Sequence, residues 1–411
     1  MVKVSADRIR VAIDIGTTKI CVIVAHKTSQ EQIEVIGIGK APSHGLRKGV
    51  VVDIAQTIRS IRQAVEEAEL MTGYAITHAA IGVSGAHISS LNSYGAVPIK
   101  HNEVRTEDIA QVIAAARAIP IPEGQQILHT LPQYFLIDGH DKVQDPLGMH
   151  GIRLEASIHI ILGAIASVQN LIKCCEMAGV QTTDIILEQL ASAAAVLSDD
   201  ECELGVAMLD IGGGTSDLAL YQRRSIKHTM VLPVAGNHFT NDIAACLRVT
   251  LDTAERIKRQ YGVACLEALE KDELIEVEMI HGGTNRLVNT TDLTAILEPR
   301  AQELLTIIHD EIIKKKLHSY MQAGLVLTGG GSLLHGIKEL AEAIFQAPVR
   351  IGYPRACHNL PAALSSPQYA TSYGLIVYMI KQEQISYKDS MQGPLLYRVF
   401  GRMKSWVGDF F

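Results

Sequence analysis

One hairpin-like motif occurs twice in this chain, and the repeat constrains the fold more than any other feature. The first copy, at 11–24, reads VAIDIGTTKICVIV and consists of two β-rich runs joined by an acidic, glycine-containing turn. The second copy, at 206–221, reads VAMLDIGGGTSDLALY and has the same layout. Two copies of one unit, near the start and the middle of the chain, predict two related lobes.

Length and composition agree with a two-lobed α/β protein. The chain has 411 residues, which exceeds the size at which one hydrophobic core usually stops growing. It is 47% hydrophobic but only 5% aromatic, and it contains 33 glycines, a composition typical of aliphatic α/β proteins. Apolar spacing predicts helices at 54–71 and 251–261.

Two further segments extend this plan. A third glycine turn follows a buried-strand pattern at 324–334, GLVLTGGGSLL, and leads into a predicted helix at 337–345. Between about 86 and 162 the pattern changes, because Thr106 and the acids after it open a predicted helix at 109–118 with strand-like runs on either side. This stretch is predicted to be an inserted subdomain with its own small sheet.

Charge, cysteine spacing and hydropathy exclude several classes of function. The net charge of −7 provides no general basic field for nucleic acid, so nucleic acid is not an expected partner. No C-x-x-C spacing occurs among the seven cysteines, which favours reduced thiols over a zinc or redox site. The N-terminus has no signal-peptide pattern, and no apolar run reaches the roughly 18 to 20 residues that cross a bilayer. Any membrane contact is therefore expected to be peripheral.

The glycine turns carry the residue types that a nucleotide's phosphate chain requires. Glycine lets backbone N–H groups approach phosphate closely, and threonine hydroxyls and a lysine add donors and charge. A carboxylate beside each turn, Asp14 and Asp210, suits a magnesium ion held through water. The candidate phosphate contacts are Gly16, Thr17, Thr18, Lys19, Gly212, Gly213, Gly214 and Thr215.

A single Asp-x-Gly turn is more often an ordinary hairpin than a nucleotide site. Two copies and a third glycine turn change that balance in favour of nucleotide binding.

In order and residue type, the three turns resemble the two phosphate loops and the adenosine loop of the actin superfamily, whose lobes are duplicated ribonuclease-H-like domains. The resemblance implies an α/β, actin-like, two-lobed ATPase fold that binds ATP and Mg²⁺, with Asp14 and Asp210 near the metal and Gly329, Gly330 and Gly331 near adenosine. The segment 187–194 is similar to a connecting helix that would place Glu188 opposite the γ-phosphate. The segment 254–259 resembles the nucleoside-contacting helix, which implies roles for Glu255, Lys258 and Arg259.

Within that superfamily the chain most resembles the bacterial cell-division FtsA family. The resemblance covers essentially the whole chain and rests on the inserted segment, with AIGVSG at 80–85, DPLGM at 145–149 and LEA at 154–156. It rests also on LTAILEPR at 293–300, which resembles the outer part of the family's second lobe. There the family binds the C-terminal tail of the tubulin-like protein FtsZ, which implies partner contacts for Arg286 and Arg300.

The C-terminal segment 395–411 reads LLYRVFGRMKSWVGDFF, with apolar residues at helical spacing. This pattern predicts an amphipathic helix that lies on a membrane, with its cations toward anionic lipid headgroups. A terminal helix packed on the protein's own core is the alternative, but the polar linker before it and the only Trp favour the membrane. The predicted membrane residues are Leu396, Arg398, Val399, Phe400, Arg402, Met403, Lys404, Trp406, Val407 and Phe410.

The family resemblance implies an ATP-binding protein, with at most weak ATPase activity, that forms head-to-tail filaments of itself. It would anchor FtsZ filaments to the cytoplasmic face of the inner membrane at the division septum and recruit later division proteins. A PilM-type pilus-assembly protein and a small-molecule kinase on the same fold are the alternatives. The C-terminal amphipathic helix argues against the first, and a phosphate-transfer assay would test the second.

The same resemblance predicts a division of the chain into six parts. They are a first lobe at 1–85 and 163–203, an inserted subdomain at 86–162, a second lobe at 204–240 and 301–381, its outer subdomain at 241–300, a linker at 382–394 and the amphipathic helix at 395–411.

Overall fold

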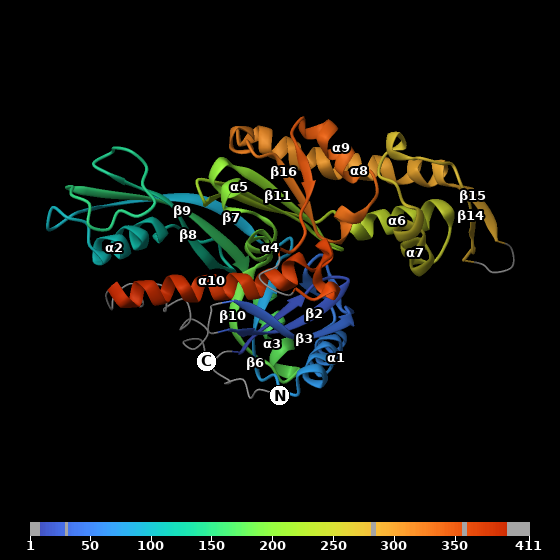
Figure 1. Cartoon of the computed structure of the whole chain (residues 1–411), viewed down its shortest axis with the longest axis horizontal. Helices are drawn as coiled ribbons and strands as arrows, with labels where there is room; N and C mark the ends of the chain where they lie inside the picture. The colour runs from blue at the N-terminus through green and yellow to red at the C-terminus, as the bar shows by residue number, and fades with distance from the viewer. Residues whose placement is uncertain (1–8, 29–31, 281–284, 356–359, 393–411) are drawn as a thin grey trace.

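Two lobes, each built on a five-stranded sheet, form the body of the protein, and an inserted α/β unit projects from one side (Figure 1). This computed structural model describes residues 9–28, 32–280, 285–355 and 360–392, with side chains through Glu383. The predicted amphipathic helix at 395–411 lies outside the described residues.

The first lobe's sheet has the strand order β10-β6-β1-β2-β3. Strands β1, β2 and β3 form an antiparallel meander, and β6 and β10 add to the β1 edge in parallel. Its strands are β1 (Ile9–Ile15), β2 (Lys19–Lys27), β3 (Ile33–Pro42), β6 (His78–Val83) and β10 (Gln181–Leu187).

The second lobe's sheet repeats this topology as β13-β12-β11-β16-β17. It again consists of an antiparallel meander with two parallel strands on the β11 edge. The repetition confirms the two related lobes predicted from the duplicated motif. The strands are β11 (Val206–Ile211), β12 (Ser216–Gln222), β13 (Ser225–Leu232), β16 (Leu325–Thr328) and β17 (Val349–Ile351).

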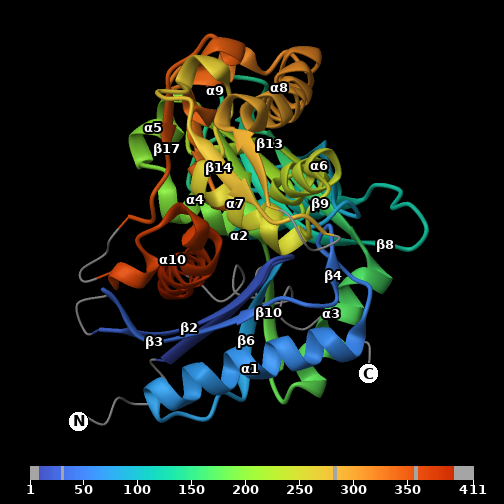
Figure 2. The same cartoon turned by 90° about the vertical axis from the view of Figure 1, so that its right-hand side faces the viewer.

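Alternation along the strands sends apolar side chains to both faces of each sheet. In β1, Ile13 and Ile15 pack with α1 (Ile54–Thr72) and α3 (Ile165–Met177), whereas Ala12 packs on the opposite face. That opposite face meets α4 and α10, which lie between the lobes (Figure 2). Residues of both sheets share this central core, so the lobes are packed through it. Helix α4 spans Glu188–Val196 and α10 spans Ala370–Gln392.

Helices also cover the outer face of the second sheet, where a core of aliphatic residues joins them to β11, β12 and β16. The small outer sheet β14-β15 extends from this region (Figure 1). The elements are α6 (Gly236–Leu247), α7 (Leu251–Tyr261), β14 (Leu274–Val277), β15 (Arg286–Asn289), α8 (Thr290–Lys314) and α9 (Ile337–Phe345).

The inserted unit is an antiparallel sheet, β7-β9-β8, with α2 packed on one face around its own core. Helix α2 begins at Thr106, before the predicted 109, because the Asp108 carboxylate accepts the backbone N–H of Arg105 at 2.9 Å and satisfies the first turn. The unit comprises β7 (Ser89–Pro98), α2 (Thr106–Arg117), β8 (Gln125–Ile137) and β9 (Arg153–Ala164).

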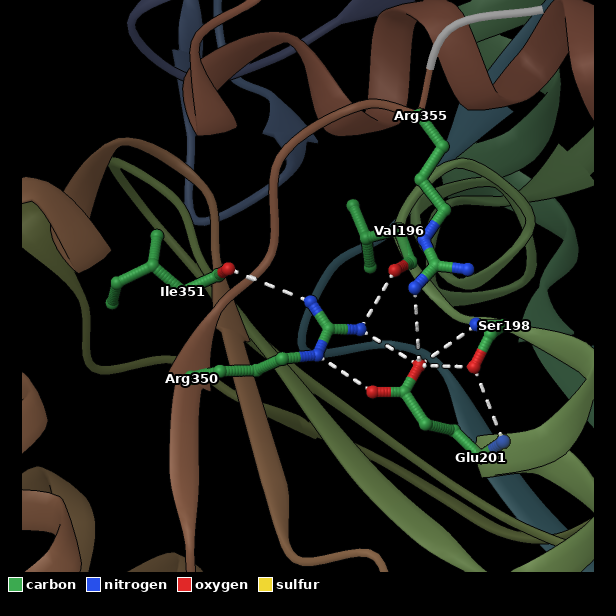
Figure 3. Close-up of polar contacts among 6 residues, drawn as sticks. All are labelled: Val196, Ser198, Glu201, Arg350, Ile351 and Arg355. Carbon is green, nitrogen blue, oxygen red and sulfur yellow. Dashed lines mark hydrogen bonds and ion pairs between the residues drawn. The ribbon is translucent and has the colours of Figure 1, made fainter.

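A salt-bridge network fixes the segment that connects the lobes (Figure 3). The short helix α5 (Asp199–Leu204), which leads into the second lobe, is capped by Ser198. The hydroxyl and the backbone N–H of Ser198 both pair with Glu201. Arg350 of β17 donates to both Glu201 oxygens at 2.6 and 2.8 Å and to the Val196 carbonyl at 2.9 Å. Burial opposes the charge on Glu201, but Arg350 and Ser198 outweigh it and lower the pKa of this carboxyl to about 2.

Three helix predictions are confirmed: α7 and α9 have the predicted limits, and α1 ends one residue later. The prediction of a linker at 382–394 was wrong for residues 382–392, because α10 continues to Gln392. The segment reads QEQISYKDSMQ at 382–392, which is polar but includes helix-favouring Gln, Glu, Lys and Met, and it contains no Gly or Pro before Gly393.

The remaining short elements connect these units. They are β4 (Leu46–Arg47), β5 (Val50–Val51) and the 3₁₀ turns η2 (Leu266–Ala268), η3 (His318–Tyr320), η4 (Gly330–Leu333), η5 (Ala362–Leu364) and η6 (Pro367–Tyr369). Across the part of the chain that the structure describes, no helix has the length and apolar character needed to cross a bilayer.

Candidate nucleotide site between the lobes

The two copies of the repeated motif form the same turn at equivalent places in the two sheets. In the first lobe the Gly16 N–H donates to the Lys19 carbonyl at 3.0 Å. In the second lobe the Gly212 N–H donates to the Thr215 carbonyl at 2.9 Å. Each turn follows the central strand of its sheet, so the motif places two matching loops at the ends of β1 and β11.

The two loops lie against each other, and glycine is required where they meet. A Cβ on Gly213 would lie 2.2 Å from Cγ2 of Thr18, and one on Gly214 would lie 2.4 Å from Oγ1 of Thr17. Real Cβ contacts are longer than 3.0 Å, so only residues without a side chain allow this approach. The sequence predicted glycines for contact with phosphate, and the structure adds a second use for them in joining the lobes.

The third glycine turn completes the ring of loops. Gly329 has a φ of +79°, and a Cβ there would lie 2.2 Å from Oδ1 of Asp210. Gly331 packs equally closely on Ile211, whereas the nearest atom to a Cβ on Gly330 is 3.9 Å away. The turn therefore packs against the end of β11 at two positions and stays open at Gly330.

Both predicted metal-site carboxylates are buried and held by hydroxyl groups from the interlobe helices. Asp14 is 3% exposed and accepts hydrogen bonds from Lys19 Nζ at 3.0 Å and from the Ser372 hydroxyl. Asp210 is 6% exposed and accepts hydrogen bonds from the hydroxyls of Ser192 at 2.5 Å and Thr371 at 2.9 Å. Because these hydroxyls belong to α4 and α10, the helices between the lobes orient both acids.

Asp217 is a third acid of the site that the sequence analysis did not assign. Its carboxylate accepts hydrogen bonds from Ser84 at 2.6 Å, Gln189 at 2.7 Å and Thr215 at 3.1 Å. One sequence feature could have indicated Asp217: it lies two residues after Thr215, and side chains two apart on a strand share a face. Ser84 and Gln189 gave no comparable signal.

Burial, with repulsion between neighbouring acids, raises the pKa values of three carboxyls in the site. Burial, together with repulsion from Asp14, Asp217 and Asp210, raises the pKa of Glu188 well above its usual range. Burial, reinforced by Asp210, raises the pKa of Asp217 to about 7. Burial also raises the pKa of Asp210. A bound cation would therefore stabilise the charged form of these carboxyls.

Lys19 points into the site, which its sequence position could not show. Burial of Lys19 opposes its charge, but the Asp14 carboxylate outweighs burial and raises the Lys19 pKa. The lysine also lies 5.4 Å from the ring centre of Tyr369. Lys19 is thus a fixed positive charge beside the first loop.

Helix α7 supplies the predicted nucleoside residues at the edge of the loops. Lys258 Nζ donates to the Gly236 carbonyl at 3.0 Å and lies 2.6 Å from Glu255, whose carboxylate accepts from Thr240 at 2.6 Å. The Gly236 N–H in turn donates to the Gly212 carbonyl at 3.0 Å, which connects the α6–α7 pair to the second loop. Arg259 is exposed, and its charge contributes to lowering the pKa values of Glu255 and Lys258.

The two predicted partner-binding arginines differ in their surroundings. Arg286 is exposed on the outer strand β15. Arg300 forms a bidentate pair with Asp242, at 2.6 and 3.0 Å, and contacts Glu303 on its own helix. Any acidic partner of Arg300 therefore competes with an internal carboxylate.

The residues present fit a magnesium nucleotide. The loops bring glycine backbone and threonine hydroxyls together at one place, and these are the groups that a phosphate chain requires. Buried carboxylates with raised pKa values supply the hard oxygen donors that magnesium prefers. Within the described ranges no three His, Cys, Asp or Glu side chains are grouped as a direct metal cage.

The duplicated sheets, facing glycine loops and interlobe acids define an actin-like protein. Solved structures share this fold: a PilM–PilN type IV pilus biogenesis complex matches with a TM-score of 0.64 at 16% identity, over 90% of this chain and 98% of that one. MreB5 of Spiroplasma citri bound to ADP matches with a TM-score of 0.56 at 16% identity, over 92% and 98%.

Two family models match the sequence: "Cell division protein FtsA" over 207–374 and "SHS2 domain inserted in FTSA" over 85–162. The curated cell division protein FtsA of Pseudomonas aeruginosa is 42% identical over 99% of both chains, and that of Escherichia coli K12 is 35% identical over 92% of both. This chain belongs to the FtsA family of actin-like cell-division proteins. The match over the whole length decides between FtsA and the pilus or kinase alternatives.

Proposed function

We propose that this protein binds ATP with Mg²⁺ between its lobes and uses the bound state to build a membrane-attached filament at the division site. The observation that carries the proposal is the meeting of the two glycine loops beside buried, mutually repelling carboxylates. Asp14 and Asp210 would hold the metal through water, and Lys19 and the loops would hold the phosphates. Glu255, Lys258 and Gly330 would contact the nucleoside.

The raised pKa of Glu188 bears on turnover. At the N-terminus of α4, burial and repulsion from three acids raise the pKa of its carboxyl and favour the neutral form. A protonated carboxyl cannot accept a proton from an attacking water, so Glu188 acts only after a cation has lowered its pKa. When bound, magnesium would supply that positive charge. We propose at most weak ATPase activity, with binding rather than turnover as the main role of the site.

Membrane attachment is assigned to the C-terminal segment at 395–411. An amphipathic helix buries its aromatic and aliphatic residues at the acyl boundary, and Arg398, Arg402 and Lys404 would meet anionic headgroups. One such helix is a marginal anchor, but head-to-tail assembly multiplies it into strong avidity. The protein would then lie peripherally on the cytoplasmic face of the inner membrane.

The outer part of the second lobe is the proposed site for the FtsZ tail and, through it, for the division ring. Arg286 is exposed there and free to meet a carboxylate, whereas Arg300 must exchange Asp242 for a partner's acid. Later division proteins would be recruited by the assembled filament. We keep the division of the chain as a proposal except for the linker at 382–392, which is part of α10, and α6 and α8 cross its limits at 240 and 300.

A binding experiment with Asp210→Asn tests the nucleotide site. Titration of MgATP should show about tenfold weaker binding, about 1.4 kcal/mol, because one hard oxygen charge beside the metal is lost. The variant should fold, since it removes a buried charge with a raised pKa. Asp310→Asn, whose side chain is 73% exposed on α8, is the matched control and should bind as the unmodified chain does. Equal MgATP affinity in Asp210→Asn would remove the basis for this site.

A further inference from the structure

A cavity lined by several cations lies between the inserted unit and the second lobe, apart from the nucleotide loops. Its volume is about 490 Å³. One wall comes from β8 and the loop after it, another from the turn between β12 and β13, and a third from α5. The lining residues are Gln133, Tyr134, Lys142, Gln144, Glu203, Arg223, Arg224 and Lys227.

The charge of this cavity is opposite to that of the chain. Lys142, Arg223, Arg224 and Lys227 line it with a single acid, Glu203, whereas the whole protein carries −7. Glu203 is paired with Arg224 at 3.1 Å, so the other three cations have no carboxylate among the lining residues. The cavity therefore concentrates uncompensated positive charge.

The cations are held close enough to repel one another. Lys142 Nζ lies 4.2 Å from the ring centre of Tyr134, and Lys227 Nζ lies 5.8 Å from the same centre. Burial, followed by repulsion from Lys142 and Arg223, lowers the pKa of Lys227 to about 8. An anion in the cavity would relieve this repulsion.

Hydrogen bonds prevent the walls from separating. Gln144 Nε2 donates to the Arg223 carbonyl at 3.0 Å and to Ser225 Oγ at 3.1 Å. Ser225 Oγ donates to the Gln133 carbonyl at 2.7 Å, and Gln133 Nε2 donates to the Ile226 carbonyl at 2.8 Å. The inserted unit and the second lobe are thus joined directly beneath the cations, which gives a preformed site.

The turn that carries the two arginines is unfavourable for them. Arg223 and Arg224 have φ angles of +50° and +57° and form the two-residue connection between β12 and β13. Such turns favour Asn-Gly, because a left-handed conformation is unfavourable for residues with a side chain. Strained residues of this kind cluster at functional sites.

We propose that this cavity binds a small soluble ligand that carries two or more linked phosphate groups. Its volume falls in the range of small-molecule sites, about 300–1,000 Å³, rather than that of an extended peptide groove. Guanidinium groups pair with phosphate in a bidentate manner, and two lysines add point charges, Lys142 from the inserted unit and Lys227 from β13 of the second lobe. A bound ligand bridges the inserted unit and the second lobe and strengthens their contact.

The double variant Arg223→Asn with Arg224→Gly tests the site without endangering the fold. It removes two cations and installs the pair that this turn prefers, so unfolding should occur at an equal or higher temperature. The lost Arg224–Glu203 pair is exposed and contributes little. The matched control removes two exposed lysines from other helices, Lys173→Gln with Lys314→Gln, and keeps the cavity intact.

The probe is inorganic pyrophosphate at 1 mM in magnesium-free buffer, and the readout is the rate at which each lysine is acylated, followed by mass spectrometry. With a Kd of about 0.1 mM, acylation of Lys227 should slow about tenfold in the unmodified chain and in the control. In the double variant the protection should fall below about twofold. Lys19 and Lys258 report the nucleotide loops separately, so binding there is not mistaken for binding in the cavity.

Three results would overturn the proposal. In the first, pyrophosphate leaves Lys227 acylation unchanged in the folded, unmodified chain. In the second, protection is the same in the double variant. In the third, a hexaglutamate peptide protects Lys227 while pyrophosphate does not, which would assign the cavity to an acidic protein segment instead.

Discussion

Replacing Gly374 by alanine should loosen the contact between α10 and α4 on which both lobes depend. A Cβ at this position would lie 2.0 Å from the Ala191 carbonyl oxygen, whereas real Cβ contacts are longer than 3.0 Å. The obstacle is backbone, which cannot rotate away, so α10 must move by at least about 1 Å. Thr371 and Ser372, which hold Asp210 and Asp14, lie on the turn that must move.

Opposing terms set the size of the effect. Alanine favours helix over glycine by about 1 kcal/mol. Overpacking a close contact costs about 1–3 kcal/mol, and weakening two hydrogen bonds to carboxylates adds about 1–2 kcal/mol. We therefore expect Gly374→Ala to lower the free energy of unfolding by about 1–4 kcal/mol and to weaken MgATP binding about tenfold.

Denaturant unfolding, followed by titration with MgATP, measures both quantities. Lys381→Ala on the exposed side of the same helix is the control and should change stability by less than about 0.5 kcal/mol. If Gly374→Ala proved as stable as the unmodified chain, the close approach of α10 to α4 would not be the contact that packs the lobes.

Two further predictions concern titrating groups. Glu201→Gln should cost about 1–3 kcal/mol at pH 7 by weakening the pair with Arg350, whereas Glu203→Gln should cost little. The folded pKa of Glu201 is lowered to about 2. The stability difference between Glu201→Gln and the unmodified chain should therefore be fully present above about pH 4.5 and be lost as the pH falls to about 2 in denaturation curves. Asp217→Asn should stabilise the ligand-free protein at pH 8 but not at pH 4, because a folded pKa raised to about 7 destabilises the folded state as the pH rises. The same variant should lose MgATP affinity in titrations.

Sequence patterns were sufficient for features that are encoded locally. Each copy of the repeated motif contains its own strands and turn, so hydrophobic alternation and glycine predicted both hairpins and the symmetry of the lobes. The candidate acids Asp14 and Asp210 followed from their positions at the ends of those strands. Helix limits at 251–261 and 337–345 were equally local.

Features that depend on packing between distant segments could not be predicted from the sequence. Ser372 is 358 residues from Asp14, and Ser84 is 133 residues from Asp217, so no spacing in the sequence joins them. The pairing of Arg300 with Asp242 likewise depends on how α8 lies against α6. Composition alone gave the wrong result at 382–392, where a polar segment continues a helix that began in the core.

Liposome co-sedimentation in the presence of MgATP measures whether the nucleotide site and the C-terminal helix together attach the protein to a membrane. The intact chain is compared with a chain that ends at Gly393 and with full-length Asp210→Asn, on vesicles that contain anionic lipid. We expect that the intact chain pellets, that the shortened chain stays in the supernatant while still binding MgATP, and that Asp210→Asn pellets less because assembly is weakened. Equal pelleting of all three proteins would contradict an ATP-dependent filament anchored by its C-terminal helix.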